Sequence, residues 1–232
     1  MFSNRVILAE GGRKLDRYTK ALLHFNGVDG STNFRDESGK IWTPSGNAQI
    51  KTDQSKFGGA SGYFDGTNSY ISTPAHSDFD FGLEDFTIDF WARLQSGITD
   101  DRIVLHRKTP SGINGSPYFK FTYVDSSWIF TAEFEGADGY LIKVYLYLEH
   151  QYDIWYHIAI VRNGSYFRIY RNGTQGDYNT SSQALAVMTS PLSIGKRLDT
   201  TGTYFKGWID EMRISKGIAR WTSNFTPPTK EY

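Results

Sequence analysis

The feature that most constrains this chain is an alternation of apolar and polar residues with a period of two. In the segment FTIDFWARL, Phe86, Ile88, Phe90, Ala92 and Leu94 fall on one side when the backbone is extended. Successive side chains of a strand point to opposite faces, so this pattern predicts a strand with one buried face. Similar runs predict further strands at residues 20–26, 69–73, 102–107, 118–124, 128–134, 140–148, 155–162, 166–171, 192–195 and 205–215. The chain should therefore contain roughly a dozen strands.

Turn-forming pairs separate several of these runs. Asn163-Gly164 and Asn172-Gly173 lie between predicted strands, and an Asn-Gly pair supplies the positive φ angles that a tight hairpin needs. Neighbouring strands should therefore often be antiparallel. The sequence lacks long amphipathic helical patterns, which disfavours a parallel sheet covered by helices, and one short helical turn is expected near residues 216–220. Together these patterns predict an all-β sandwich of two antiparallel sheets.

Composition narrows the possible functions. A chain of 232 residues can form one large sandwich domain, and its 25 basic residues balance its 25 acidic ones, so nucleic acid is not an expected partner. Without cysteine the chain has neither a disulfide framework nor a thiolate metal site. The first residues carry too short an apolar run for a signal peptide, and no stretch of about 18 apolar residues predicts insertion into a membrane.

The first 19 residues differ from the rest of the chain. Residues 1–19 are rich in Arg and Lys, contain a Gly11-Gly12 break and show no clear period. They form either a disordered terminus or an arm that becomes ordered on a partner. We therefore divide the chain into an N-terminal arm, residues 1–19, and a β-sandwich domain, residues 20–232.

Several motifs, taken in their order along the domain, carry a family resemblance. They are ALLHFNG (residues 21–27), SKFGGAS (55–61), YFDG (63–66), DFTIDFW (85–91), WYHIAIVR (155–162), IG (194–195), GWIDEMRIS (207–215) and RWTSNFTPP (220–228). The ordered set resembles the concanavalin A-like, laminin-G-like jelly-roll domains found in tail and other virion proteins of tailed bacteriophages. The resemblance covers residues 21–232 and implies a two-sheet antiparallel jelly-roll sandwich. It does not fix the activity, because one sandwich fold hosts lectins, glycanases and purely structural modules.

The sequence argues against catalysis. Glucanase relatives place their carboxylates in a Glu-x-Asp-x-x-Glu motif, which is absent from this sequence. Asp210 and Glu211 are adjacent, so on a regular strand they should point to opposite faces and could not act on one substrate. The five histidines show no zinc-binding spacing. We therefore expect no catalytic residues and a protein that is not an enzyme.

The resemblance also implies a structural cation. Glucanase-like members of the superfamily often hold calcium with groups of the first strand, a glycine carbonyl in an early turn and an aspartate of the last strand. The matching positions are Asn26, Gly66 and Asp210. Calcium takes oxygen ligands, so such a set is chemically sensible. The alternative is that Asp210 only accepts hydrogen bonds from backbone amides.

A binding surface is expected on one strand. Lys143, Tyr145 and Tyr147 alternate with apolar neighbours, so they should point away from the core, and Tyr123 has a similar position in an earlier strand. Exposed aromatic rings could stack on sugar rings, but they could also contact another protein or nothing at all.

These expectations converge on one leading function. The chain should be a non-enzymatic surface protein of a phage virion, tail-associated or on the capsid. Its jelly-roll domain would bind a host cell-surface glycan or stabilise the particle. The arm would contact other virion proteins, and a homo-oligomer is possible. Localisation in the virion, after assembly in the host cytoplasm, agrees with the lack of a signal peptide. The alternatives are a free lectin-like protein and a glycan-degrading enzyme.

Overall fold

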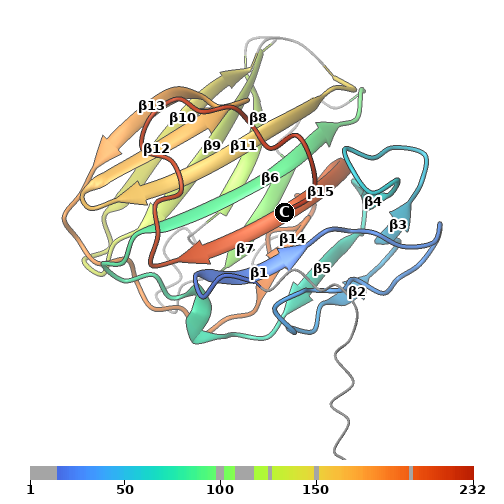
Figure 1. The fold of residues 1–232 in the computed structure, drawn as a ribbon, viewed down its shortest axis with the longest axis horizontal. Coiled ribbons are helices and arrows are strands. Elements are labelled where there is room, and N and C mark those ends of the chain that lie inside the picture. The colour runs from blue at the N-terminus through green and yellow to red at the C-terminus, as the bar shows by residue number, and fades with distance from the viewer. Residues whose placement is uncertain (1–14, 98–101, 108–117, 125–126, 149–151, 199–200) are drawn as a thin grey trace, which may run out of the picture.

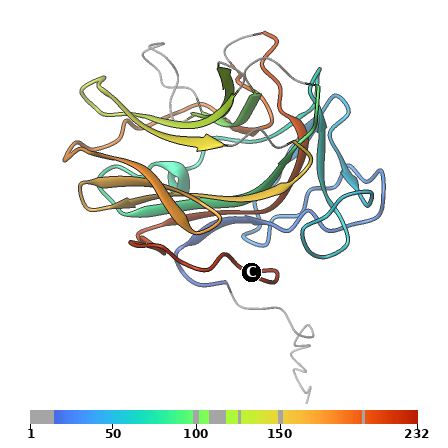
Figure 2. The ribbon, with the colours of Figure 1, turned by 90° about the horizontal axis from the view of Figure 1, so that it is seen from above.

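The computed structural model describes residues 15–97, 102–107, 118–124, 127–148, 152–198 and 201–232. In these residues every regular element is a strand except one short 3-10 helix, η1 (Ser77–Phe79). The strands form two antiparallel sheets that stack as the two layers visible in Figure 2. The prediction of an all-β sandwich is confirmed.

The two sheets interleave strands from all parts of the chain (Figure 1). The first sheet contains, in spatial order, β13 (Thr174–Thr180), β12 (Tyr166–Arg171), β11 (Trp155–Asn163), β6 (Phe86–Leu94), β15 (Lys206–Lys216), β4 (Ser61–Asp65) and β3 (Gln49–Lys51), while β1 (Thr19–Leu23) also pairs with β15. The second sheet contains β10 (Leu141–Leu148), β9 (Ser127–Glu135), β8 (Tyr118–Val124), β7 (Arg102–Arg107), β14 (Leu192–Ile194), β5 (Tyr70–Thr73) and β2 (Thr43–Ser45). Strands β13 and β10 thus lie at matching edges of the two sheets.

The core lies between the sheets and follows the alternation seen in the sequence. On β6 the buried inner residues include Phe86 and Phe90. Their rings meet the other sheet at Phe134 and Phe130, with ring centres 5.2 and 6.0 Å apart. Aromatic pairs at such spacings add stabilisation beyond the area that they bury. The core therefore fixes the register of both sheets.

Four strands and one turn differ from the sequence prediction. Strands β2, β3, β4 and β13 were not predicted, because they are short or carry mainly polar residues and glycine. The predicted helical turn near residues 216–220 is wrong. Strand β15 continues to Lys216, and Gly217 then takes a φ of +84°, which ends the strand without starting a helix.

The Asn172-Gly173 hairpin is confirmed and has a second role. Both residues have positive φ, at +47° and +79°, which gives the tight turn between β12 and β13. A Cβ atom on Gly173 would lie 1.7 Å from the carbonyl oxygen of Phe225. Glycine is therefore required here both by the turn and by the close approach of the chain end.

That chain end, residues 217–232, crosses the face of the first sheet that points away from the second sheet. We call it the C-terminal strap, and Figures 1 and 2 show it lying on this outer face. Trp221 and Phe225 stack with ring centres 4.0 Å apart, and both rings meet the edge of His157. Phe225 N donates to Gly173 O at 2.9 Å. The strap therefore covers a large part of a sheet face that would otherwise be open.

The end of the predicted arm also contacts the domain. Asp16 accepts hydrogen bonds from the backbone amides of Tyr18 and Thr19 and pairs with Arg220 of the strap at 2.8 Å. Residues 1–14, the rest of the predicted arm, lie outside the described residues. Residues 16–19 thus contact the folded domain and belong to it.

A β-bulge interrupts β15 at Asp210 and Glu211. The register with β6 shifts between Asp210 and Arg213, and Glu211 has a φ of +50°. Ile209 and Met212 both lie in the core, so the two acidic residues between them both leave the inner face. The prediction that they point to opposite faces is wrong, because the extra residue of the bulge breaks the alternation.

Candidate functional site

A groove lies where the edges of the two sheets meet. It has a volume of about 480 Å3 and is formed by β10 on one side and by β12 and β13 on the other. Tyr145 and Tyr147 of β10 contribute their rings, with 39% and 73% of each residue exposed. Arg171, Gln175 and Asp177 supply polar groups from the opposite wall. Exposed rings beside a few hydrogen-bonding groups are the features expected of a small-molecule site.

Side chains from the first sheet satisfy the free backbone edge of β10. Tyr145 N donates to an oxygen of Asp177 at 3.3 Å, and Arg171 donates to Tyr147 O at 3.2 Å. Asn179 donates to Lys143 O at 3.1 Å. Because these bonds occupy backbone groups that an added strand would need, the rings rather than the strand edge are presented to a ligand.

Gly176 allows the two walls of the groove to approach each other. A Cβ atom at this position would lie 2.5 Å from a methyl group of Leu146. Gly176 sits in a bulge of β13, where the pairing with β12 shifts register between Arg168 and Tyr170. The bulge and the missing side chain together set the width of the groove.

The predicted platform residues occupy different positions. Tyr145 and Tyr147 line the groove together. Lys143 is part of the same strand but pairs with Glu133 at 3.2 Å, outside the groove lining. The backbone of Tyr123 pairs with Trp128 in the second sheet, and its side chain lies outside the described residues. The structure therefore groups two of the four residues.

The predicted calcium ligands are not gathered into one cage. Gly66 follows β4, and Asp210 lies beyond the pairing of Ile209 with Gly62, about four to five residues or roughly 15 Å along the strands. The Gly66 carbonyl accepts a hydrogen bond from Arg102 at 3.3 Å, and the Asn26 amide donates to Glu231 at 2.7 Å. In the described part of the chain, no three His, Asp or Glu side chains form a metal-binding group. The Asn26, Gly66 and Asp210 set does not fit one calcium ion, and calcium itself stays a prediction.

Asp210 is nevertheless an unusual residue. It is fully buried, and one carboxylate oxygen accepts from Lys56 N at 2.7 Å and Phe57 N at 3.1 Å. Its other oxygen, Oδ1, is buried without a hydrogen-bond partner. Burial, together with the neighbouring charge of Glu211, raises the pKa of Asp210 to about 7. One of the two carboxylate oxygens of Asp210 thus accepts hydrogen bonds from backbone amides, as the alternative to calcium binding predicts, and the other does not.

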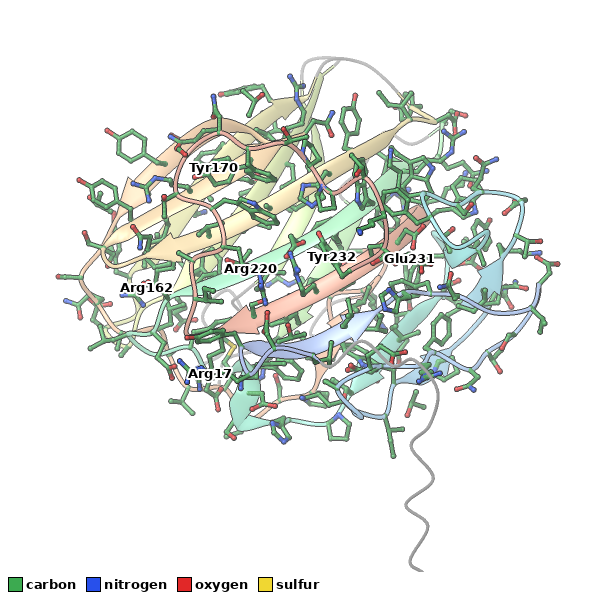
Figure 3. All side chains as sticks on the ribbon, viewed as in Figure 1. Arg17, Arg162, Tyr170, Arg220, Glu231 and Tyr232 are labelled. Atoms are coloured by element: carbon green, nitrogen blue, oxygen red, sulfur yellow. The ribbon has the colours of Figure 1, made fainter. Side chains whose placement is uncertain are left out.

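A cluster of charged groups lies under the strap. Arg213 donates to both oxygens of the buried Asp89, at 3.1 and 3.2 Å, and the Tyr232 hydroxyl donates to the same carboxylate. Burial by itself raises the pKa of Asp89, but Arg213 and the hydrogen bonds of His157 and Tyr232 bring that pKa below its ordinary value. Figure 3 shows Tyr232 at the end of the strap above β15. The cluster fastens the strap, and its carboxylate, Asp89, is fully buried.

Glu211 fastens the same end of the chain. It accepts from Tyr232 N at 3.1 Å and lies 2.7 Å from Nδ1 of His24. The hydrogen bond with Glu211 raises the pKa of the His24 imidazole. Asp210 and Glu211 share a side of the strand, but each is held by its own partners beneath the surface. Their arrangement is that of structural carboxylates.

Comparison with known protein families decides where the chain belongs. The family model described as the concanavalin A-like lectin/glucanases superfamily matches residues 65–220. The chain belongs to the concanavalin A-like lectin/glucanase superfamily. No curated protein sequence matches the chain.

Solved structures of this sandwich include several toxin domains. The binding domain of Paraclostridial Mosquitocidal Protein 1 is 18% identical, with a TM-score of 0.62, and the match covers 87% of this chain and 49% of that one. The binding domain of botulinum neurotoxin serotype G is 15% identical, with a TM-score of 0.62 and coverage of 85% and 48%. The receptor binding domain of botulinum neurotoxin D is 14% identical, with a TM-score of 0.61 and coverage of 87% and 50%. The chain spans about half the length of these structures, and the likeness concerns the fold.

The described residues that line the groove do not include the pair of acids that a glycanase of this superfamily uses. A retaining glycosidase needs two carboxyl groups about 5 Å apart. Among the described residues that line the groove, Asp177 is the one acid, and it accepts a hydrogen bond from Tyr145 N.

In the described part of the chain, no helix has the length and apolar character needed to span a membrane.

Sequence reasoning missed one wall of the groove. Gln175, Gly176 and Asp177 belong to the polar segment TQGDYNT, which carries no apolar alternation and was not predicted as a strand. The available signal was the Asn172-Gly173 turn, because a tight hairpin requires a second strand after it. That signal would place residues from 174 onward beside β12.

Proposed function

We propose that this superfamily member is a non-enzymatic carbohydrate-binding protein whose ligand lies in the groove between β10 and β13. The observation that carries the proposal is the pair of exposed rings, Tyr145 and Tyr147, facing Arg171 and Gln175 across the groove. An aromatic ring offers an apolar face to the C–H face of a sugar, and nearby polar groups bond the hydroxyls. A groove with one engaged carboxylate supports binding without hydrolysis.

The proposed setting is the surface of a phage virion, on the tail or the capsid. This part rests on the resemblance of the ordered motifs, above all the closing segment RWTSNFTPP, to virion proteins of tailed bacteriophages. In the structure this segment forms most of the strap, which gives its Trp and Phe residues a physical role. The basic residues 1–14 are proposed to contact other virion proteins, leaving the groove to face the host cell.

The test is binding of the fluorescently labelled full chain to bacterial cells, before and after periodate oxidation of the surface glycan. Binding is expected to disappear after oxidation. Tyr147→Ala is expected to weaken binding about tenfold or more, since the ring loses its whole contact area. Tyr140→Ala is the matched control, because Tyr140 is also exposed, at 64%, but does not line the groove.

Two outcomes separate the alternatives. Cells that stay unlabelled, together with no binding to an array of purified glycans, would contradict the carbohydrate-binding proposal and favour a decoration role on the particle. Release of shortened oligosaccharides during incubation with a defined polysaccharide would instead establish a glycan-degrading enzyme.

A further inference from the structure

A second depression lies on the other side of β13. It has a volume of about 630 Å3 and is formed by β12, β13 and the strap. Tyr166 and Tyr178 present their rings, with 43% and 57% of each residue exposed and ring centres 6.3 Å apart. Thr222 and Ser223 of the strap, which carry hydroxyl groups, line the same space. Its size is within the range of about 300–1,000 Å3 found for small-molecule sites.

Arg168 is the one cation among the described residues that line this depression. The guanidinium of Arg168 lies over the Tyr166 ring, 4.5 Å from its centre. Its Nη1 atom is buried and has no hydrogen-bond partner. No acid is among the described residues that line the depression. Because Arg168 lines the depression, its positive charge is available to an anionic group of a ligand that lies there.

A second unsatisfied group lies two residues further along the same strand. The hydroxyl of Tyr170 is also buried without a partner, and Figure 3 shows Tyr170 near the path of the strap. Burial raises the pKa of this hydroxyl, and the positive charge of Arg168 opposes the rise. The charge of Arg168 and the hydroxyl of Tyr170 therefore interact electrostatically on the outer face of β12.

We propose that this depression binds a carboxylate-bearing sugar, with the guanidinium of Arg168 holding the carboxylate and the rings of Tyr166 and Tyr178 contacting the sugar. The planar fork of an arginine matches the two oxygens of a carboxylate. Thr222, Ser223 and Gln175, which also line the depression, would supply hydrogen-bonding groups for the sugar hydroxyls. An inorganic anion would leave both rings without a contact.

The proposal deepens the proposed function and rests on it. Gln175 lines both the groove of Tyr145 and Tyr147 and the depression of Arg168. One extended acidic glycan could therefore cross β13, with a sugar in the groove and the acidic sugar beside Arg168. The ligand class is an acidic oligosaccharide or polysaccharide.

The experiment compares acidic glycans with their carboxyl-reduced forms. Oligogalacturonate, sialyllactose and a hyaluronan fragment are titrated into the full chain by calorimetry, each beside the same glycan after reduction of its carboxylates to alcohols. At least one acidic glycan is expected to bind about tenfold or more tightly than its reduced form. This preference should shrink as the salt concentration rises, because the contact is between charges.

Three variants test whether Arg168 causes the preference for acidic glycans. Arg168→Gln should bind the acidic and reduced forms equally, while Arg168→Lys should keep part of the preference because the charge remains without the fork. Arg35→Gln removes the same charge at an exposed position that pairs with Glu37, and it should behave as the unaltered chain. Thermal melting establishes that each variant is folded.

The outcomes distinguish this proposal from the proposed function. Binding that depends on Tyr147 but does not discriminate acidic from reduced glycans overturns the acidic-sugar proposal alone. A preference for acidic glycans that survives in Arg168→Gln also overturns it. No binding of any glycan, acidic, reduced or neutral, overturns both.

Discussion

Replacing Asp210 by Asn should change how the stability of the protein depends on pH. The carboxyl group has a pKa of about 7 in the folded chain, against an ordinary value of 3.8. Its folded-state pKa is thus raised, because burial disfavours the charged form and one oxygen has no partner. The amide of Asn has nearly the same shape and does not titrate.

The size of the effect follows from the pKa difference. Between about pH 4 and pH 7 the folded chain keeps a proton on Asp210 that the unfolded chain has lost, so stability falls as pH rises through this window. At about 1.4 kcal/mol for each pKa unit, the loss is about 4 kcal/mol and is complete above pH 7. Below about pH 4 both states are protonated, and the group contributes no pH dependence.

The assay is urea unfolding of the unaltered chain and Asp210→Asn at several values between pH 4 and pH 8. The free energy of unfolding of the unaltered chain, minus that of the variant, should fall by up to about 4 kcal/mol across this range. A buried amide donor without a partner costs the variant about 1–3 kcal/mol at every pH, which shifts the difference curve without changing its slope.

Asp65→Asn is the control with the opposite sign. Burial raises the pKa of Asp65, but hydrogen bonds from Ser69, Thr67 and Asn68 outweigh burial and hold it well below 3.8. In measurements extended below pH 4, the unaltered chain should therefore lose its advantage over this variant as the pH falls below about 4. A level difference curve for Asp210→Asn between pH 4 and pH 8 would refute the reasoning about burial.

Three further predictions concern the strap and the cation. Asp89→Asn should lower the free energy of unfolding by about 3–5 kcal/mol in urea, because Arg213 keeps a buried charge without its partner, and a loss below about 1 kcal/mol would contradict that pairing. Gly173→Ala should lower the melting temperature, since it combines a positive φ with a clash on the Phe225 carbonyl, while Gly164→Ala in the other hairpin has open space and should cost less. Calcium is tested by measuring the melting temperature of the chain with about 5 mM CaCl2 and with a chelator. An increase with calcium that Asp210→Asn abolishes would place the ion at Asp210. Equal melting temperatures would contradict the calcium prediction.

Much of the fold could be predicted because its strands obey one local rule. Strands β6, β7, β8 and β12 have the predicted bounds, since a strand that is half buried must alternate. Strand β13 could not be found this way, because it lies at a sheet edge and presents mainly polar side chains. The bulge at Asp210 was also hidden, since nothing in the letters Asp-Glu marks an inserted residue.

The candidate site was predictable only on one side. The outward direction of Tyr145 and Tyr147 follows from the alternation on β10, and the structure places both in the groove. Which strand would face them depends on how the edges of two sheets meet, and that arrangement is not local. The predicted calcium positions are not brought together for a related reason: Gly66 and Asp210 match a family pattern by position in the sequence, but β4 and β15 hold them apart.

The path of the strap has a mechanical consequence. Its contacts reach Gln175 on β13, His157 on β11, Asp89 on β6 and, through Glu231, Asn26 beyond β1. The hydrogen bonds of an antiparallel sheet run across the strands, so a force that pulls β13 away from β1 can open them one pair of strands at a time. The strap runs in that same direction over the sheet (Figure 1), so the same force would also stretch the strap. If the protein is held to a particle near residue 15 and to a cell at the β13 edge, the force between the two attachment points would therefore act along the strap.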